Sequence, residues 1–107
     1  MRILLDESTP RGLRAFFPGD VVETVPEKGW ASVKNGELLS LAVENGYDVF
    51  ITPDQALDSQ QNLASYDVAV VVLPLARNTM PSYESRRESL AAIVQAAPRG
   101  EASWFTA

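Results

Sequence analysis

Two short apolar runs in this chain each end in an aspartate, and this pattern limits the possible folds more than any other feature. Residues 3–5 lead directly into Asp6, and residues 49–52 lead through Pro53 into Asp54. Apolar runs of this length, separated by helix-like segments, are typical of strands in a parallel α/β sheet, whose carboxyl ends open onto one shared crevice. We therefore expect Asp6 and Asp54 to converge at that edge of the sheet.

The rest of the chain continues this alternation of strands and helices. The predicted strands cover residues 2–5, 21–25, 48–52, 68–73 and, at an edge of the sheet, 102–106. The first predicted helix starts at Ser8-Thr9-Pro10, where a hydroxyl N-cap precedes a proline. The second starts at Asn35 or its neighbour, and the last runs from Pro81 to residue 97. Gly46 is expected to end the second helix, and a helical turn is expected near residues 60–64. This order predicts right-handed crossovers and a three-layer α/β/α sandwich with a mostly parallel sheet, formed by residues 1–107 as a single domain.

Histidine and cysteine are both absent from the 107 residues, and this removes several kinds of chemistry. A Ser-His-Asp triad, a thiolate metal site and a disulfide framework are excluded, which leaves carboxylates, hydroxyls, basic side chains and metal ions for catalysis. The net charge of −5 argues against non-specific binding of nucleic acid by bulk electrostatics. No apolar run approaches the roughly 18 residues that a membrane span needs, and the first residues read as a strand rather than a signal peptide. We expect a cytoplasmic protein without membrane association.

Acidic and amide side chains at the predicted carboxyl edge are the candidates for chemistry. Asp6 and Asp54 follow strands, while Glu37 opens the second helix. Asn35 stands beside Glu37, and oxygen donors gathered in this way are the usual ligands of Mg²⁺ or Mn²⁺. Each residue also has a structural interpretation, because aspartates cap helices and turns, Glu37 suits the helix dipole, and Asn35 is the most obvious N-cap in the chain. Arg77 follows the fourth predicted strand and is expected at the same edge, either in contact with a phosphate or in a surface ion pair.

The other charged and aromatic residues have weaker claims. Glu7 and Asp58 are expected to be solvated, and Trp30 is expected to anchor a loop by hydrophobic contact. The arginines expected on solvated helix faces are Arg11, Arg14, Arg86 and Arg87.

Several motifs, taken together in order and spacing, match a known pattern over nearly the whole chain. They are M-R-I-L-L-D-E at 1–7 with a proline-started helix after it, G-D-V-V-E-T-V at 19–25, G-E-L-L at 36–39 with Ala42 and Gly46, I-T-P-D at 51–54, and Q-Q-N-L at 60–63. This pattern resembles the small stand-alone PIN-like domains of bacteria. That family usually opens with M-K-I-L-L-D-E-N-L-P and continues with a D-x-E-L/I-L helix and a V-T-T-D-K motif, and one subgroup carries Y-Q-Q-N-L.

The resemblance implies a PIN-type sheet whose carboxylates hold one or two Mg²⁺ or Mn²⁺ ions. Such ions activate a water and stabilise the negative charge that develops during phosphodiester cleavage. By position, Asp6, Glu37 and Asp54 match the acidic pattern of the family. The resemblance also implies kinship with the ribonuclease toxins of toxin–antitoxin pairs, with RNA as the substrate and an antitoxin protein as the partner. Because an acidic chain attracts RNA weakly, we also expect self-association or a protein partner to complete the functional surface.

Two departures from the family pattern leave other functions open. Asn35 stands where the family commonly has aspartate, which removes a negative charge from the predicted metal site. Pro53 and Gln55 replace the threonine and lysine that flank the aspartate of V-T-T-D-K. One alternative is therefore a catalytically weakened PIN-like module that binds a protein or RNA. The other is an enzyme that acts on a different phosphate substrate at the same carboxyl edge.

Overall fold

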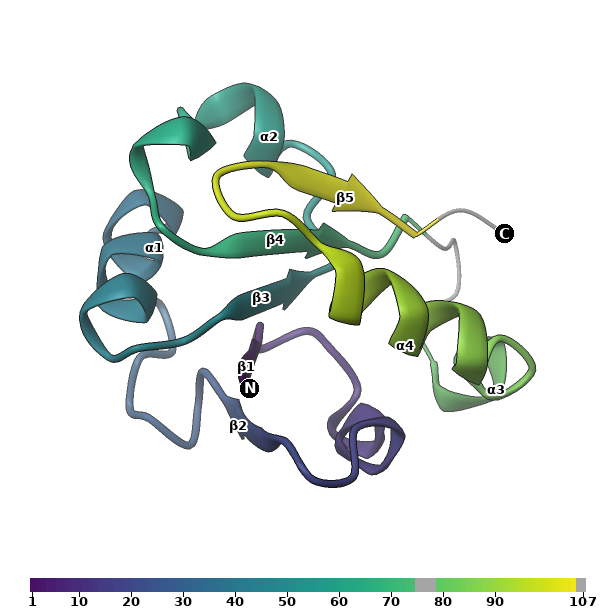
Figure 1. Ribbon diagram of the computed structural model, residues 1–107. Helices are drawn as coiled ribbons and strands as arrows, with labels where there is room; N and C mark the ends of the chain where they lie inside the picture. Colours follow the sequence, from purple (N-terminus) through teal and green to yellow (C-terminus); the bar gives the residue numbers. More distant parts are fainter. Residues whose placement is uncertain (75–78, 106–107) are drawn as a thin grey trace.

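The computed structural model describes residues 1–74 and 79–105, and the strands in this part of the chain form one sheet of five parallel strands (Figure 1). The order across the sheet is β2-β1-β3-β4-β5. The strands are β1 (Arg2–Leu5), β2 (Val21–Thr24), β3 (Val49–Thr52), β4 (Ala69–Val72) and β5 (Ala102–Trp104). Each lies within a predicted strand, so the predicted α/β class and parallel sheet are confirmed.

Helical segments cover both faces of the sheet. They are η1 (Arg11–Phe16) and η2 (Leu63–Ser65), which are 3₁₀ helices, and α1 (Asn35–Glu44), α2 (Leu57–Gln60), α3 (Met80–Glu84) and α4 (Arg87–Ala96). Buried residues of η1, α3 and α4 share one hydrophobic cluster, and those of α1, α2 and η2 share a second. Because successive side chains of a strand point to opposite faces, the three inner strands β1, β3 and β4 each contribute to both clusters. The predicted three-layer α/β/α arrangement is therefore confirmed.

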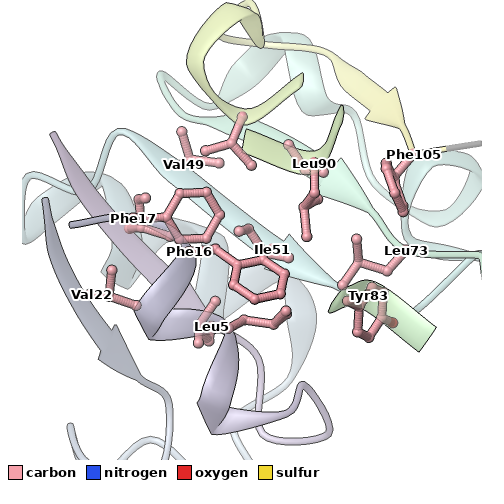
Figure 2. Packing of buried hydrophobic residues seen from close by; sticks show 14 of the residues in the cluster. Leu5, Phe16, Phe17, Val22, Val49, Ile51, Leu73, Tyr83, Leu90 and Phe105 are labelled. Atoms are coloured by element: carbon pink, nitrogen blue, oxygen red, sulfur yellow. The ribbon is translucent and has the colours of Figure 1, made fainter. Parts of the chain in front are cut away.

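The two clusters also fix the direction in which the residues after β1 and β3 lie. Leu5 and Ile51 belong to the cluster under η1, α3 and α4, which Figure 2 shows from close by. Leu4 and Phe50 belong to the cluster under α1 and α2. Thr52 stands two residues after Phe50, so it continues the face covered by α1 where β3 ends.

The neighbouring strands β1 and β3 send the chain to opposite faces of the sheet. After β1 the chain enters η1 on one face, and after β3 it enters α2 on the other. This divergence makes the carboxyl ends of β1 and β3 the topological switch point of the sheet, and in doubly wound sheets with the order 2-1-3-4-5 ligands bind at this point. The fold therefore marks the ends of β1 and β3 as the expected ligand site.

The prediction of right-handed crossovers is wrong for one of the two connections that join β3 to β4 and β4 to β5. The steps from β3 to β4 and from β4 to β5 move in the same direction across the sheet. The first crossover uses α2 and η2 on one face, whereas the second uses α3 and α4 on the other face. The two crossovers must therefore have opposite hands. The second crossover ends in β5, a strand of only three residues at the edge of the sheet. The preference for right-handed crossovers comes from strand twist, which acts over only a short length in such a strand.

The predicted continuous helix over residues 81–97 is also wrong, because α3 and α4 are separate helices. Ser85 and Arg86 lie between them, and Arg86 has a non-helical backbone with φ −122° and ψ 21°. The six residues 84–89 are all polar, so no apolar side chain in this stretch holds one helix axis against the sheet. Tyr83 anchors α3 in the core and Leu90 anchors α4.

The first predicted helix start and the predicted capping role of Asn35 differ from the structure. The first helix is a 3₁₀ helix that begins after Pro10, and Thr9 does not cap it, because its hydroxyl donates to the Ile51 carbonyl at 3.4 Å. The residue before α1 is Lys34, and Asn35 is the first helical residue rather than the N-cap. The end of α1 is as predicted, since Gly46 follows it with φ +75°, a conformation that favours glycine.

Candidate functional site

Asp6 is held at the end of β1 by backbone contacts on both sides. Its N–H donates to the Ile51 carbonyl at 2.9 Å, and its carbonyl accepts from the Thr9 N–H at 2.9 Å. The side chain is partly buried, and its Oδ1 accepts from the Glu7 N–H at 2.8 Å. These contacts fix the Asp6 carboxylate beside the end of β3.

Thr52 is the residue that connects the two aspartates. Its side chain is fully buried, and its hydroxyl donates to Asp6 Oδ2 at 2.6 Å. The same oxygen accepts from the Asp54 N–H at 3.1 Å. Sequence reasoning placed Thr52 only in a strand. The available signal was a hydroxyl at the end of an otherwise apolar, buried run, where a polar group needs a hydrogen-bond partner.

Asp54 lies against the start of α1. Its Oδ1 accepts from the Ala56 N–H at 2.9 Å, and its Oδ2 accepts from Asn35 Nδ2 at 2.9 Å. Gly36, the next residue of α1, leaves room for Gln61, whose Oε1 would lie 3.1 Å from a Cβ added at that glycine. Asp6, Thr52, Asp54 and Asn35 thus form one hydrogen-bonded group, which we call the carboxyl-edge cluster.

Burial makes Asp6 a perturbed acid. Desolvation raises the pKa of Asp6 above its ordinary value of 3.8, and the charges of Glu7 and Asp54 raise it further. The hydrogen bonds from the Thr52 hydroxyl and the Glu7 N–H lower the pKa and partly offset this effect. A positive charge at the cluster would stabilise the ionised form, because opposite charges favour ionisation.

The other predicted site residues are placed differently. Glu37 lies in the first turn of α1, two residues after Asn35, and its side chain is exposed. Within residues 1–74 and 79–105, no group of three or more acidic, histidine or cysteine side chains is arranged to hold a metal ion. Arg77 lies outside the described residues, and Asp58 and Glu7 are exposed as expected. The catalytic and metal-binding roles of Asp6, Glu37, Asp54 and Asn35 stay predictions.

The donor set of the carboxyl-edge cluster fits a small, hard divalent cation. Its available ligands are carboxylate, amide and hydroxyl oxygens, which Mg²⁺ and Mn²⁺ prefer over the nitrogen and sulfur ligands of zinc. Magnesium keeps several waters and is commonly bound by one or two carboxylates together with substrate phosphates. Asp6 and Asp54 provide two carboxylates, so a third protein acid is not required for such a site.

Comparison with protein-family models, with curated proteins and with solved structures gives no match to this chain. Among the described helices, none is long and apolar enough to cross a membrane.

Replacing Thr52 tests whether its hydroxyl orients the two aspartates. Thr52→Val keeps the shape of the side chain but removes both hydrogen bonds, so we expect the pKa of Asp6 to rise and the protein to lose about 1–3 kcal/mol of stability. Thr52→Ser keeps the hydroxyl and is expected to leave the pKa of Asp6 near the wild-type value. Carbon-detected NMR titration of the aspartate carboxyl groups measures the first quantity and urea unfolding the second. An unchanged pKa of Asp6 in Thr52→Val would contradict the geometry.

The raised pKa of Asp6 also predicts a pH-dependent stability difference. In the folded protein the pKa of Asp6 lies above its ordinary value of 3.8, so Asp6 binds its proton at a higher pH than it does in the unfolded chain. Protonation of Asp6 therefore stabilises the folded protein relative to the unfolded chain as pH falls from neutral through the raised pKa. Asp6→Asn lacks this contribution, while other titrating groups are common to both proteins and cancel in the difference. We expect the free energy of unfolding of the wild type, relative to Asp6→Asn, to be higher at about pH 4.5 than at about pH 7. A difference that is constant with pH, or that has the opposite slope, would show that Asp6 is not desolvated.

Proposed function

We propose that the protein is a divalent-cation-dependent ribonuclease and that the carboxyl-edge cluster is its active site. One observation carries the proposal: Asp6 and Asp54 follow neighbouring parallel strands, and one buried hydroxyl, that of Thr52, bonds both the Asp6 carboxylate and the Asp54 N–H at the switch point of the sheet. Ligand sites of doubly wound sheets lie at such points. Histidine and cysteine are absent from the sequence, and among the chemistries that remain, carboxylates with a divalent cation are the route to phosphodiester cleavage that we propose.

In this proposal, the residues of the cluster bind and orient. Asp6 and Asp54 hold the cation, and Thr52 together with the Ala56 N–H fixes the positions of their oxygens. When bound, Mg²⁺ or Mn²⁺ stabilises the negative charge that develops on the phosphate and activates water for attack. Glu37 is the third acid of the proposal, because it stands in the first turn of α1 and its exposed side chain is free to move toward a substrate. Arg77 is proposed to contact the phosphate.

The choice of RNA and of a biological role depends on the resemblance to PIN-like domains. This resemblance favours a cytoplasmic toxin of a toxin–antitoxin pair, inhibited by an antitoxin protein. The net charge of −5 supports the further proposal that a second copy or a partner completes the RNA-binding surface, because the chain itself offers little long-range attraction to RNA.

A catalytically weakened binding module is the second candidate, and the hydrogen bonds of the cluster favour it. Each of the four carboxylate oxygens of Asp6 and Asp54 accepts a hydrogen bond from the protein itself. A cluster that is satisfied in this way is stable without a cation. Such a protein would bind RNA or a protein partner at this edge without cleaving RNA.

Substitution of the two aspartates tests the proposal. We expect wild-type protein to bind Mn²⁺ in calorimetry and to cleave RNA in the presence of Mg²⁺ or Mn²⁺. Asp6→Asn and Asp54→Asn each remove a charge that attracts the cation, so we expect Mn²⁺ affinity to fall on the order of 10–100-fold and cleavage to be lost.

Asp67→Asn is the matched control, because Asp67 is highly exposed, with 77% of its side chain accessible, and precedes β4 at the opposite end of the strands. This variant has the same change of charge and is expected to bind Mn²⁺ and cleave RNA as the wild type does. Wild-type protein that binds RNA with no cation-dependent cleavage would overturn the ribonuclease proposal in favour of the binding module.

A further inference from the structure

The four hydrogen bonds to the carboxylates of the cluster differ in how easily they can be broken. The donors to Asp6 are the Glu7 backbone N–H and the hydroxyl of the fully buried Thr52. One donor to Asp54 is the Ala56 backbone N–H. The remaining donor, Asn35 Nδ2, belongs to a partly exposed side chain that can rotate away without moving the backbone. Asp54 Oδ2 is therefore the oxygen that the protein can most readily release to a ligand.

The side-chain amide of Asn35 turns its N–H group, and not its oxygen, toward the Asp54 carboxylate, and this orientation opposes the binding of a cation there. Two acceptor oxygens would repel each other, so the carboxylate of Asp54 selects the amide nitrogen as its neighbour. The positive end of the amide dipole then points at Asp54 Oδ2, the oxygen that we expect a cation to use. Lys34, the residue before α1, makes no side-chain capping hydrogen bond, and the side chain of Asn35 is held by its contact with Asp54.

We propose that Asn35 competes with the divalent cation for Asp54 and thereby sets the occupancy of the site. In the free protein the amide satisfies Asp54 Oδ2, and cation binding requires this hydrogen bond to break. The site is then tuned to bind its cation weakly, with a metal-free state that is stable in its own right. This inference rests on the proposed cation site, and it adds that Asn35 is an intramolecular competitor rather than a ligand.

Removal of the amide distinguishes a competitor from a ligand. A competitor opposes the cation by the strength of one hydrogen bond to a charged group, so we expect Asn35→Ala to bind Mn²⁺ about tenfold more tightly than the wild type in calorimetry. The same variant leaves Asp54 Oδ2 without its donor, so we expect its melting temperature without metal to be lower. The rise in melting temperature on adding saturating Mn²⁺ should accordingly be larger than in the wild type.

Ser40→Ala is the matched control on the same helix. The Ser40 hydroxyl donates to the Gly36 carbonyl at 3.3 Å and makes no hydrogen bond to Asp54, so this variant should bind Mn²⁺ as the wild type does. Asn35→Asp is the second test variant, because it removes the donor and adds a charge, and it should bind Mn²⁺ more tightly than Asn35→Ala.

The outcomes separate this inference from the proposed function. Equal or weaker Mn²⁺ binding by Asn35→Ala, with binding by the wild type, would overturn the inference and leave the cation site standing. Binding by Asn35→Ala and Asn35→Asp but not by the wild type would support the inference and overturn the cation-dependent activity proposed for the wild type. A complete lack of Mn²⁺ binding in all three proteins would overturn both.

Discussion

The pairing of β1 with β3 is the constraint on which the candidate site depends. Leu5 lies opposite Ile51 in the parallel register, and the Asp6 N–H continues the ladder by donating to the Ile51 carbonyl. This register places the Asp6 carboxylate beside the hydroxyl of Thr52. A slip of one residue would turn Thr52 toward the opposite face of the sheet, because side chains alternate along a strand. The clusters packed on both faces of β1 and β3 fit these side chains closely and oppose such a slip, so the core of the protein determines the geometry of its polar edge.

The sequence predicted the parts of the structure that depend on local pattern. The apolar runs before Asp6 and Asp54 are strands, and their carboxyl ends meet as parallel strands must. The roles of polar side chains were less predictable, because they depend on contacts between distant segments. Asn35 is a good N-cap by type, yet its amide donates to Asp54, 19 residues away. Thr52 fits a strand of β-branched and aromatic residues by type, yet its hydroxyl bonds both aspartates. The polar stretch between α3 and α4 has helix-forming residues but nothing that anchors a continuous helix to the sheet.

The electrostatics of the cluster bear on both proposed functions. Asp6 is partly desolvated and feels the charges of Glu7 and Asp54, so its ionised form is stabilised less than that of an exposed aspartate. A cation would relieve this cost, and the oxygen donors present suit Mg²⁺ or Mn²⁺. The hydrogen bonds from the Thr52 hydroxyl and the Glu7 N–H relieve part of this cost without a cation. The balance between these two ways of stabilising the carboxylates decides whether the edge acts as a metal centre or as a polar binding surface.

The position of bound manganese in a crystal shows whether Asp6 and Asp54 hold a cation. Crystals of the wild type grown or soaked with Mn²⁺ would be measured by anomalous diffraction, which identifies the metal independently of any assay of activity. We predict an anomalous peak between the carboxylates of Asp6 and Asp54, with the Asn35 amide turned away from Asp54. Manganese bound only elsewhere on the protein, or an unchanged cluster without a peak at saturating Mn²⁺, would contradict it.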